Sequence, residues 1–158
     1  MKILVINAGS SSLKYQLIDM DTEKMMAKGI CDRIGTEESF IKYQKAGESA
    51  KKTPRAIPNH VQAFRLVTQA LVDPKKGVIS DLSEISAVGH RVVQGGAIFD
   101  HSVLVTDEVI RQIQSLIPLA PLHNKPEADA ILACREVFGK KMPQCVVFDT
   151  SFHATMPE

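Results

Sequence analysis

The chain has 158 residues, of which 44% are hydrophobic, and its 19 basic and 18 acidic side chains leave a formal net charge of +1. This length suits one domain that buries a core without disulfides. The balanced charge argues against a generic nucleic-acid-binding surface and against a disordered tail. Apolar runs fall far short of the about 20 residues of a membrane span, and the N-terminus lacks a signal-peptide core. The three cysteines form no CxxC pair and are typical of the reduced thiols of a cytoplasmic protein. Together with the charge and the short apolar runs, they lead us to expect a cytoplasmic protein without membrane or nucleic-acid partners.

The first part of the chain is predicted to be a run of strands. Residues Lys2–Asn7 have a buried-strand pattern, and Leu13–Asp19 alternates with a period of two. The small residues Ala8–Ser12 therefore join two strands, as in a hairpin. A third strand is expected at Met25–Asp32. The polar stretch 35–58 resembles an exposed insertion or flap, with a candidate strand at its residues 39–44.

The rest of the chain alternates helices with strands. In chain order we expect a helix at His60–Val72 capped by Asn59, a strand at Ile85–Val93, a short extended piece at Ser102–Thr106, a helix at Asp107–Ile117, a loop at Pro118–Pro126, a helix at Glu127–Phe138 and a strand at Gln144–Asp149. A run of strands followed by alternating helices and strands predicts an α/β domain with a mixed sheet.

The first candidate site is the hairpin loop with its flanks. Small residues allow close approach of the backbone to phosphate oxygens. The hydroxyls of Ser10 and Ser12 add donors, Lys14 adds a positive charge, and Asn7 offers an oxygen to a metal or its waters. The loop matches neither the P-loop pattern nor the dinucleotide-binding fingerprint. An ordinary Gly/Ser hairpin has the same composition, so phosphate binding is one of two interpretations.

A second candidate lies where a buried strand ends in His-Arg before a double glycine. The planar fork of Arg91 suits a carboxylate or a phosphate, and alternation puts Val93 on the same side of the strand. A charge beside an apolar wall fits a short-chain carboxylate. A structural ion pair of Arg91 is the alternative.

Two further segments could carry chemistry. Asp149 follows the last strand, and the carboxyl end of a sheet strand is a usual position for polar catalytic groups in α/β enzymes. Capping of the next turn would explain it equally well. Leu122 and His123 belong to a proline-flanked loop, which could also be a plain connector.

Four segments in order resemble one family, acetate kinase. They are ILVINAGSSSLK at 3–14, GHRVV at 89–93, APLHN at 120–124 and VFDTSFH at 147–153, with Met-Pro at 156–157. The resemblance implies an N-terminal ribonuclease-H-like lobe over residues 1–158, as in the superfamily of actin, Hsc70 and sugar kinases. It also implies reversible, Mg²⁺-dependent phosphoryl transfer from ATP to acetate, giving acetyl phosphate and ADP. Propionate kinases share these segments.

The same resemblance implies roles for the nucleotide side of the site. Asn7 corresponds to the magnesium-site residue. Ser10, Ser12 and Lys14 correspond to the phosphate-contacting loop, with Lys14 as the ATP contact.

For the acetate side, Arg91 corresponds to the residue that binds the substrate carboxylate. Val93 and Leu122 correspond to the walls of the methyl pocket, and Asp149 corresponds to the catalytic aspartate. The acetate carboxylate is already ionised at neutral pH, because its pKa lies near about 4–5. Asp149 is therefore expected to organise the metal and its waters rather than to remove a proton.

The chain departs from the family pattern in three respects. Gln94 stands where the family usually has a histidine, and it can hydrogen-bond but cannot become a cation. Lys125 separates Asn124 from Pro126, which could alter how that loop sits. The family's second lobe, with its adenosine pocket and further catalytic groups, has no counterpart in these residues.

We therefore expect little kinase activity from these residues alone. The chain is then either a piece of a kinase or a short binding module that retains affinity for phosphate or carboxylate. A chaperone-like nucleotide switch is disfavoured by Arg91 and Val93. The family's homodimer forms largely through the other lobe, so the sequence leaves the oligomeric state open.

Overall fold

The structure is a computed structural model that describes residues 1–92, 103–104, 121–139 and 141–148. Its elements are β1 (Lys2–Ala8), β2 (Leu13–Asp19), β3 (Lys24–Asp32), β4 (Phe40–Lys45), β5 (Lys51–Pro54), α1 (His60–Leu71), the 3₁₀ helix η1 (Leu82–Glu84), β6 (Ile85–Val92), β7 (Val103–Leu104), α3 (Pro121–Phe138) and β8 (Gln144–Phe148). The helix expected at 107–117 lies outside the described residues.

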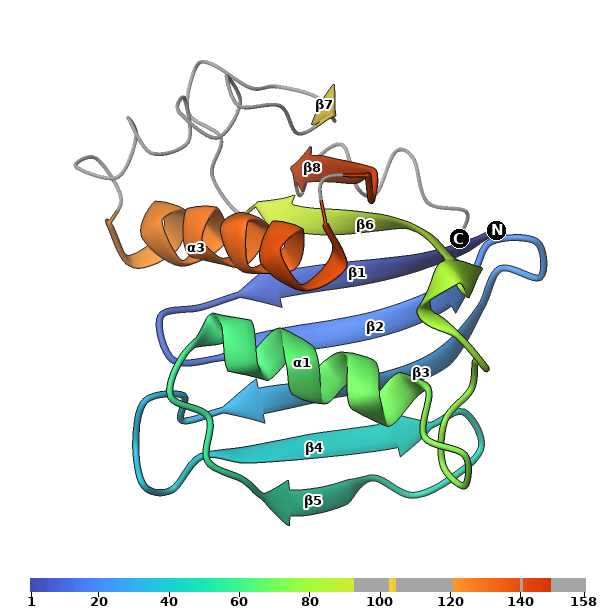
Figure 1. The fold of residues 1–158 in the computed structure, drawn as a ribbon, viewed down its shortest axis with the longest axis horizontal. Coiled ribbons are helices and arrows are strands. Elements are labelled where there is room, and N and C mark those ends of the chain that lie inside the picture. Colours follow the sequence, from blue (N-terminus) through green and yellow to red (C-terminus); the bar gives the residue numbers. More distant parts are fainter. Residues whose placement is uncertain (93–102, 105–120, 140, 149–158) are drawn as a thin grey trace.

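One mixed sheet connects the strands of the described part, in the order β5-β4-β3-β2-β1-β6-β8-β7 (Figure 1). Strands β1 to β5 form an antiparallel meander, while β1, β6 and β8 run parallel and β7 pairs antiparallel with β8. Figure 1 shows α1 and α3 on the same face of the sheet, and they contact each other. The predicted α/β architecture with a mixed sheet is confirmed.

The apolar core lies between this face and the two helices. The strand predicted at Lys2–Asn7 is confirmed as β1, which buries Leu4, Ile6 and Ala8 on the helix side. Helix α1 contributes the fully buried Phe64, and the predicted cap is confirmed because the Asn59 side chain accepts a 2.9 Å hydrogen bond from the backbone N–H of residue 62.

The prediction of an exposed flap at 35–58 is wrong in part. The candidate strand at 39–44 is confirmed as β4, and β5 extends the sheet beyond it, while Ile41 and Ile57 are buried. The buried Ser39 hydroxyl donates to the carbonyl of Arg55 and accepts from the N–H of Ile57. The segment is polar because β5 is an exposed edge strand without buried residues and β4 buries only Ile41 fully.

The prediction of a loop at Pro118–Pro126 is also wrong from Pro121 onward. Helix α3 begins at Pro121, where a proline is well suited because the first helical N–H needs no partner. The helix continues through Pro126 to Phe138. Its later turns are buried in the core, so tertiary packing outweighs the local preference of proline for a loop.

The three cysteines are unpaired thiols, as expected. Cys31 and Cys134 are fully buried in the core, and burial raises the pKa of each thiol to about 12. Both thiols are therefore inert filler rather than reactive groups. Among the described residues, neither helix has the length and apolarity that crossing a membrane requires.

Gly29 lies where the neighbouring strands leave no room for a side chain. A Cβ atom here would overlap the carbonyl oxygen of Lys42 and the hydroxyl of Tyr15, which donates a 2.8 Å hydrogen bond to that oxygen. We expect Gly29→Ala to lower the free energy of unfolding by about 3 kcal/mol, because overpacking and loss of this hydrogen bond act together. Urea unfolding measures the change. Tyr15→Phe removes the bond without crowding, so it should cost only about 1 kcal/mol; equal losses would contradict the steric explanation.

Candidate active site

The loop between β1 and β2 is held by three hydrogen bonds. The N–H of Gly9 donates to the carbonyl of Ser12 at 2.9 Å. The carbonyl of Ser11 accepts from the N–H of Ile34 at 2.8 Å. The carbonyl of Gly9 accepts from Nε2 of His60, the first residue of α1, at 2.9 Å. The predicted hairpin is thus confirmed, and it is fixed to two other parts of the chain.

Glycine at position 9 suits the close packing within the loop, because a larger residue would force the Ser12 side chain to rotate away. A Cβ atom there would lie 2.7 Å from Oγ of Ser12. Ser12 is half-buried, while Ser10 is exposed at the tip. Asn7 and Lys14 face each other at the base of the loop, as direct partners in the β1–β2 register. The four residues predicted for the nucleotide side therefore share one small region.

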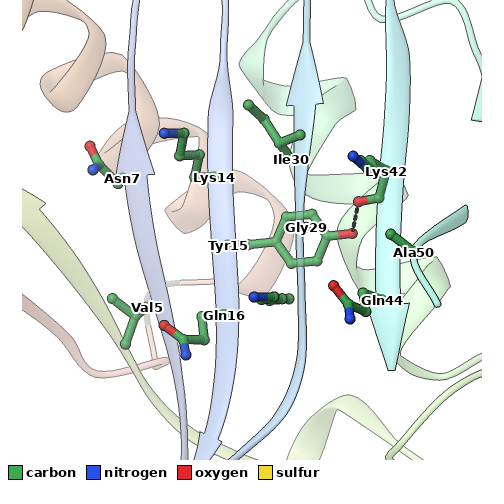
Figure 2. Close-up of a pocket in the computed structure, with 11 residues that line it drawn as sticks. Val5, Asn7, Lys14, Tyr15, Gln16, Gly29, Ile30, Lys42, Gln44 and Ala50 are labelled. Carbon is green, nitrogen blue, oxygen red and sulfur yellow. Dashed lines mark hydrogen bonds between the residues drawn. The ribbon is translucent and has the colours of Figure 1, made fainter. Parts of the chain in front are cut away.

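A groove of about 500 Å³ begins beside this loop and runs over strands β1 to β4 (Figure 2). Its lining includes two cross-strand rows, Asn7-Lys14-Ile30-Lys42 and Val5-Gln16-Lys28-Gln44. The β1 members alternate with the buried core residues of that strand, so these rows lie on the sheet face away from α1. Three exposed lysines and no acidic residue line the groove, which favours anionic ligands. Sequence reasoning missed Lys28 and Lys42, whose convergence requires the strand register.

Of the acetate-side residues, Arg91 and Leu122 are described, and only through the backbone. Arg91 lies in β6 and pairs with Val147 in β8, and Asp149 follows directly after β8. Because β1, β6 and β8 are parallel, their carboxyl ends meet at the sheet edge that carries the hairpin loop. Leu122 is the second residue of α3 rather than part of a loop. Val93 and Asp149 lie outside the described residues, as do Gln94 and the side chains of Arg91 and Leu122.

A buried polar pair next to Arg91 was missed by sequence reasoning. His90 in β6 and Gln144 in β8 are 2% and 5% exposed, and Nε2 of the histidine donates to Oε1 of the glutamine at 2.6 Å. Nδ1 of His90 has no hydrogen-bond partner within the described part of the chain. Burial lowers the pKa of His90 to about 4, although the bond to Gln144 opposes the shift, so the ring is neutral at pH 7.

The depressed pKa of His90 predicts a specific loss of stability in acid. Below about pH 6.5 the unfolded state binds a proton that the folded state does not, so stability falls as the pH drops from about 6.5 to about 4. The contribution is about 3 kcal/mol at most. His90→Gln removes this titration but keeps a donor for Gln144. Urea unfolding across this pH range should therefore show a shallower loss in the variant, and parallel curves would show that His90 does not titrate in this way.

Oxygen ligands suit Mg²⁺, which usually takes one or two carboxylates together with phosphate oxygens and waters. The half-buried Asn7 borders the anion-favouring groove, and its side-chain oxygen suits contact with the metal or with one of its waters. No cluster of three or more His, Cys, Asp or Glu side chains occurs among the described residues that could hold a metal by itself.

Strands β1 to β3 are antiparallel, β6 and β8 continue the sheet parallel to β1, and helices cover one face. This arrangement is the ribonuclease-H-like lobe of the kinase and ATPase superfamily that includes actin and Hsc70. Residues 2–158 match the acetokinase family, and the chain belongs to that family. It is 50% identical to the acetate kinase of Thermoanaerobacter pseudethanolicus over the whole chain, which is 39% of that relative's length.

Solved structures agree with this assignment. A Porphyromonas gingivalis acetate kinase superposes with a TM-score of 0.90 at 39% identity, over 99% of this chain and 39% of that one. A propionate kinase from Francisella tularensis gives a TM-score of 0.81 at 36% identity, over 99% of this chain and 38% of that one. The chain thus spans about two fifths of the length of its relatives.

Proposed function

We propose that these residues form the acetate- and phosphate-binding half of an acetate kinase that transfers the γ-phosphoryl group of ATP reversibly to acetate. The observation that carries this proposal is convergence at one sheet edge. The hairpin loop, Asn7 and Lys14 meet there with the end of the strand that bears Arg91. A second lobe would supply the adenosine pocket and the remaining catalytic groups.

The main catalytic task is electrostatic, because the attacking carboxylate and the γ-phosphate are both anionic. Arg91 would bind and orient the carboxylate by its two-pronged donor set. Lys14 and the donors of the loop would hold the phosphates. Mg²⁺, held by Asp149 and Asn7, would offset negative charge on the phosphate oxygens when bound. Val93 and Leu122 would form the wall against the methyl group and exclude water from it.

The experiment is a steady-state assay of the complete protein that contains these residues, with acetate, propionate and butyrate as acceptors and coupled detection of ADP. The proposal expects the highest kcat/KM with acetate. A higher value with propionate would make the protein a propionate kinase. Absence of transfer to all three acids, with ATP binding retained in calorimetry, would favour a binding module instead. The 158-residue chain by itself should show at most background turnover.

A further inference from the structure

We propose that His60 is a positioning residue for the hairpin loop between β1 and β2. By donating a hydrogen bond to the carbonyl of Gly9, it orients the loop so that backbone N–H groups are available to phosphate. This inference rests on the proposed function, because it concerns how that loop binds ATP. His60 lies 51 residues from Gly9 in the sequence, and its Nε2 is 2.9 Å from the Gly9 carbonyl oxygen. Since a carbonyl oxygen can only accept, Nε2 carries the hydrogen and donates it.

The geometry of the peptide unit explains why this contact matters. In a trans peptide the C=O and the following N–H point in opposite directions, and the chain has no cis peptide among its described residues. With the Gly9 carbonyl directed to His60, the N–H of Ser10 points away from α1. With the Ser11 carbonyl directed to the N–H of Ile34, the N–H of Ser12 likewise points away from its anchor. The two contacts thus aim two backbone donors outward from the body of the lobe.

The contact also removes a competing acceptor. A tight four-residue turn over Gly9–Ser12 would normally close with a bond from the N–H of Ser12 to the carbonyl of Gly9. Here only the opposite bond forms, from the N–H of Gly9 to the carbonyl of Ser12. Within the described part of the chain, the N–H groups of Ser10, Ser11 and Ser12 donate to no protein acceptor. Outward N–H groups of this kind form anion-binding nests for phosphate.

His60 is itself held rigidly. It is the first residue of α1, directly after the Asn59 cap, and the helix is fastened to the core by Phe64, which is fully buried one turn later. The helix therefore fixes the Gly9 end of the loop, while the bond of Ser11 to Ile34 holds its other side. Glycine at position 9 and serines at 10 to 12 would otherwise be flexible.

The test compares variants of the complete protein at position 60. His60→Leu keeps the volume but lacks a donor, and His60→Ala serves if the leucine variant does not fold. His60→Gln retains a side-chain N–H donor, and Gln69→Ala on the exposed side of α1 is the matched control. Titration calorimetry measures the Kd for ATP, and steady-state assays measure KM for ATP and for acetate separately.

We expect His60→Leu to weaken ATP binding about tenfold, which corresponds to one hydrogen bond, to raise KM for ATP in parallel and to leave KM for acetate within about twofold. His60→Gln should restore much of the affinity, and Gln69→Ala should change nothing. An unchanged Kd in folded His60→Leu, an equal rise of both KM values, or a glutamine variant as weak as leucine would each overturn the proposal. If the wild-type protein binds ATP but transfers nothing to acetate, the proposed function fails while the Kd comparison still tests His60.

Discussion

An Arg91→Ala variant of the complete protein is expected to lose on the order of 10²–10⁴-fold in kcat/KM for acetate, because a carboxylate would lose two charge-assisted hydrogen bonds. The loss should appear mainly in KM for acetate, with KM for ATP little changed. Steady-state kinetics with each substrate varied in turn measures both. Arg91 lies in the core strand β6 near its carboxyl end, so a thermal unfolding scan must accompany the kinetics.

Arg91→Lys is the informative partner of that variant. Lysine keeps the charge but lacks the planar fork, so it should recover only part of the lost kcat/KM. Full recovery would mean that charge alone suffices. If Arg91→Ala were folded and kept its KM for acetate, Arg91 would instead serve the structural ion pair that its sequence context also allows.

An Asp149→Asn variant is expected to lose on the order of 10²–10³-fold in kcat, as typical for loss of one group that stabilises transition-state charge. It should also need more Mg²⁺ for half-maximal activity, because we assign Asp149 to the metal and its waters. Activity measured over a Mg²⁺ series at saturating ATP and acetate tests both effects. Glu37→Gln, at an exposed loop position, is the control for loss of a negative charge.

The two measurements on Asp149→Asn separate two roles. A fall in turnover with unchanged apparent Mg²⁺ affinity would show that Asp149 does not organise the metal. That result would revive a proton-transfer role, although the acetate carboxylate has no proton to give at neutral pH. Unchanged turnover would contradict a catalytic role of Asp149 altogether.

The sequence predicted much of the fold because its local signals are strong. A buried-strand pattern predicted β1, alternation predicted β2, the small residues predicted their hairpin, and Asn59 marked the start of α1. The same approach was wrong where a local signal competes with packing. Polar residues concealed β5, although a candidate strand at 39–44 anticipated β4, and prolines concealed the first turns of α3.

Part of the candidate site could likewise be predicted from the sequence. Residue types and their order along the chain were enough to indicate the family, to which the chain belongs, and to propose Asn7, Lys14, Arg91 and Asp149 as functional. These proposals came from short contiguous segments, in which the spacing itself carries the information.

Contacts between distant segments were decided only by the tertiary structure. The bond of His60 to the carbonyl of Gly9 joins residues 51 apart, and that of His90 to Gln144 joins residues 54 apart. The lysine-lined groove likewise needs four strands in a defined register. A hydrogen bond or a groove depends on distances between chain segments, and no periodicity within either segment encodes them. The sequence alone therefore determined which lobe this chain forms and which residues are candidates for its chemistry. The packing of α1 against the sheet and the pairing of β8 with β6 decided how the loop and the strand ends are held.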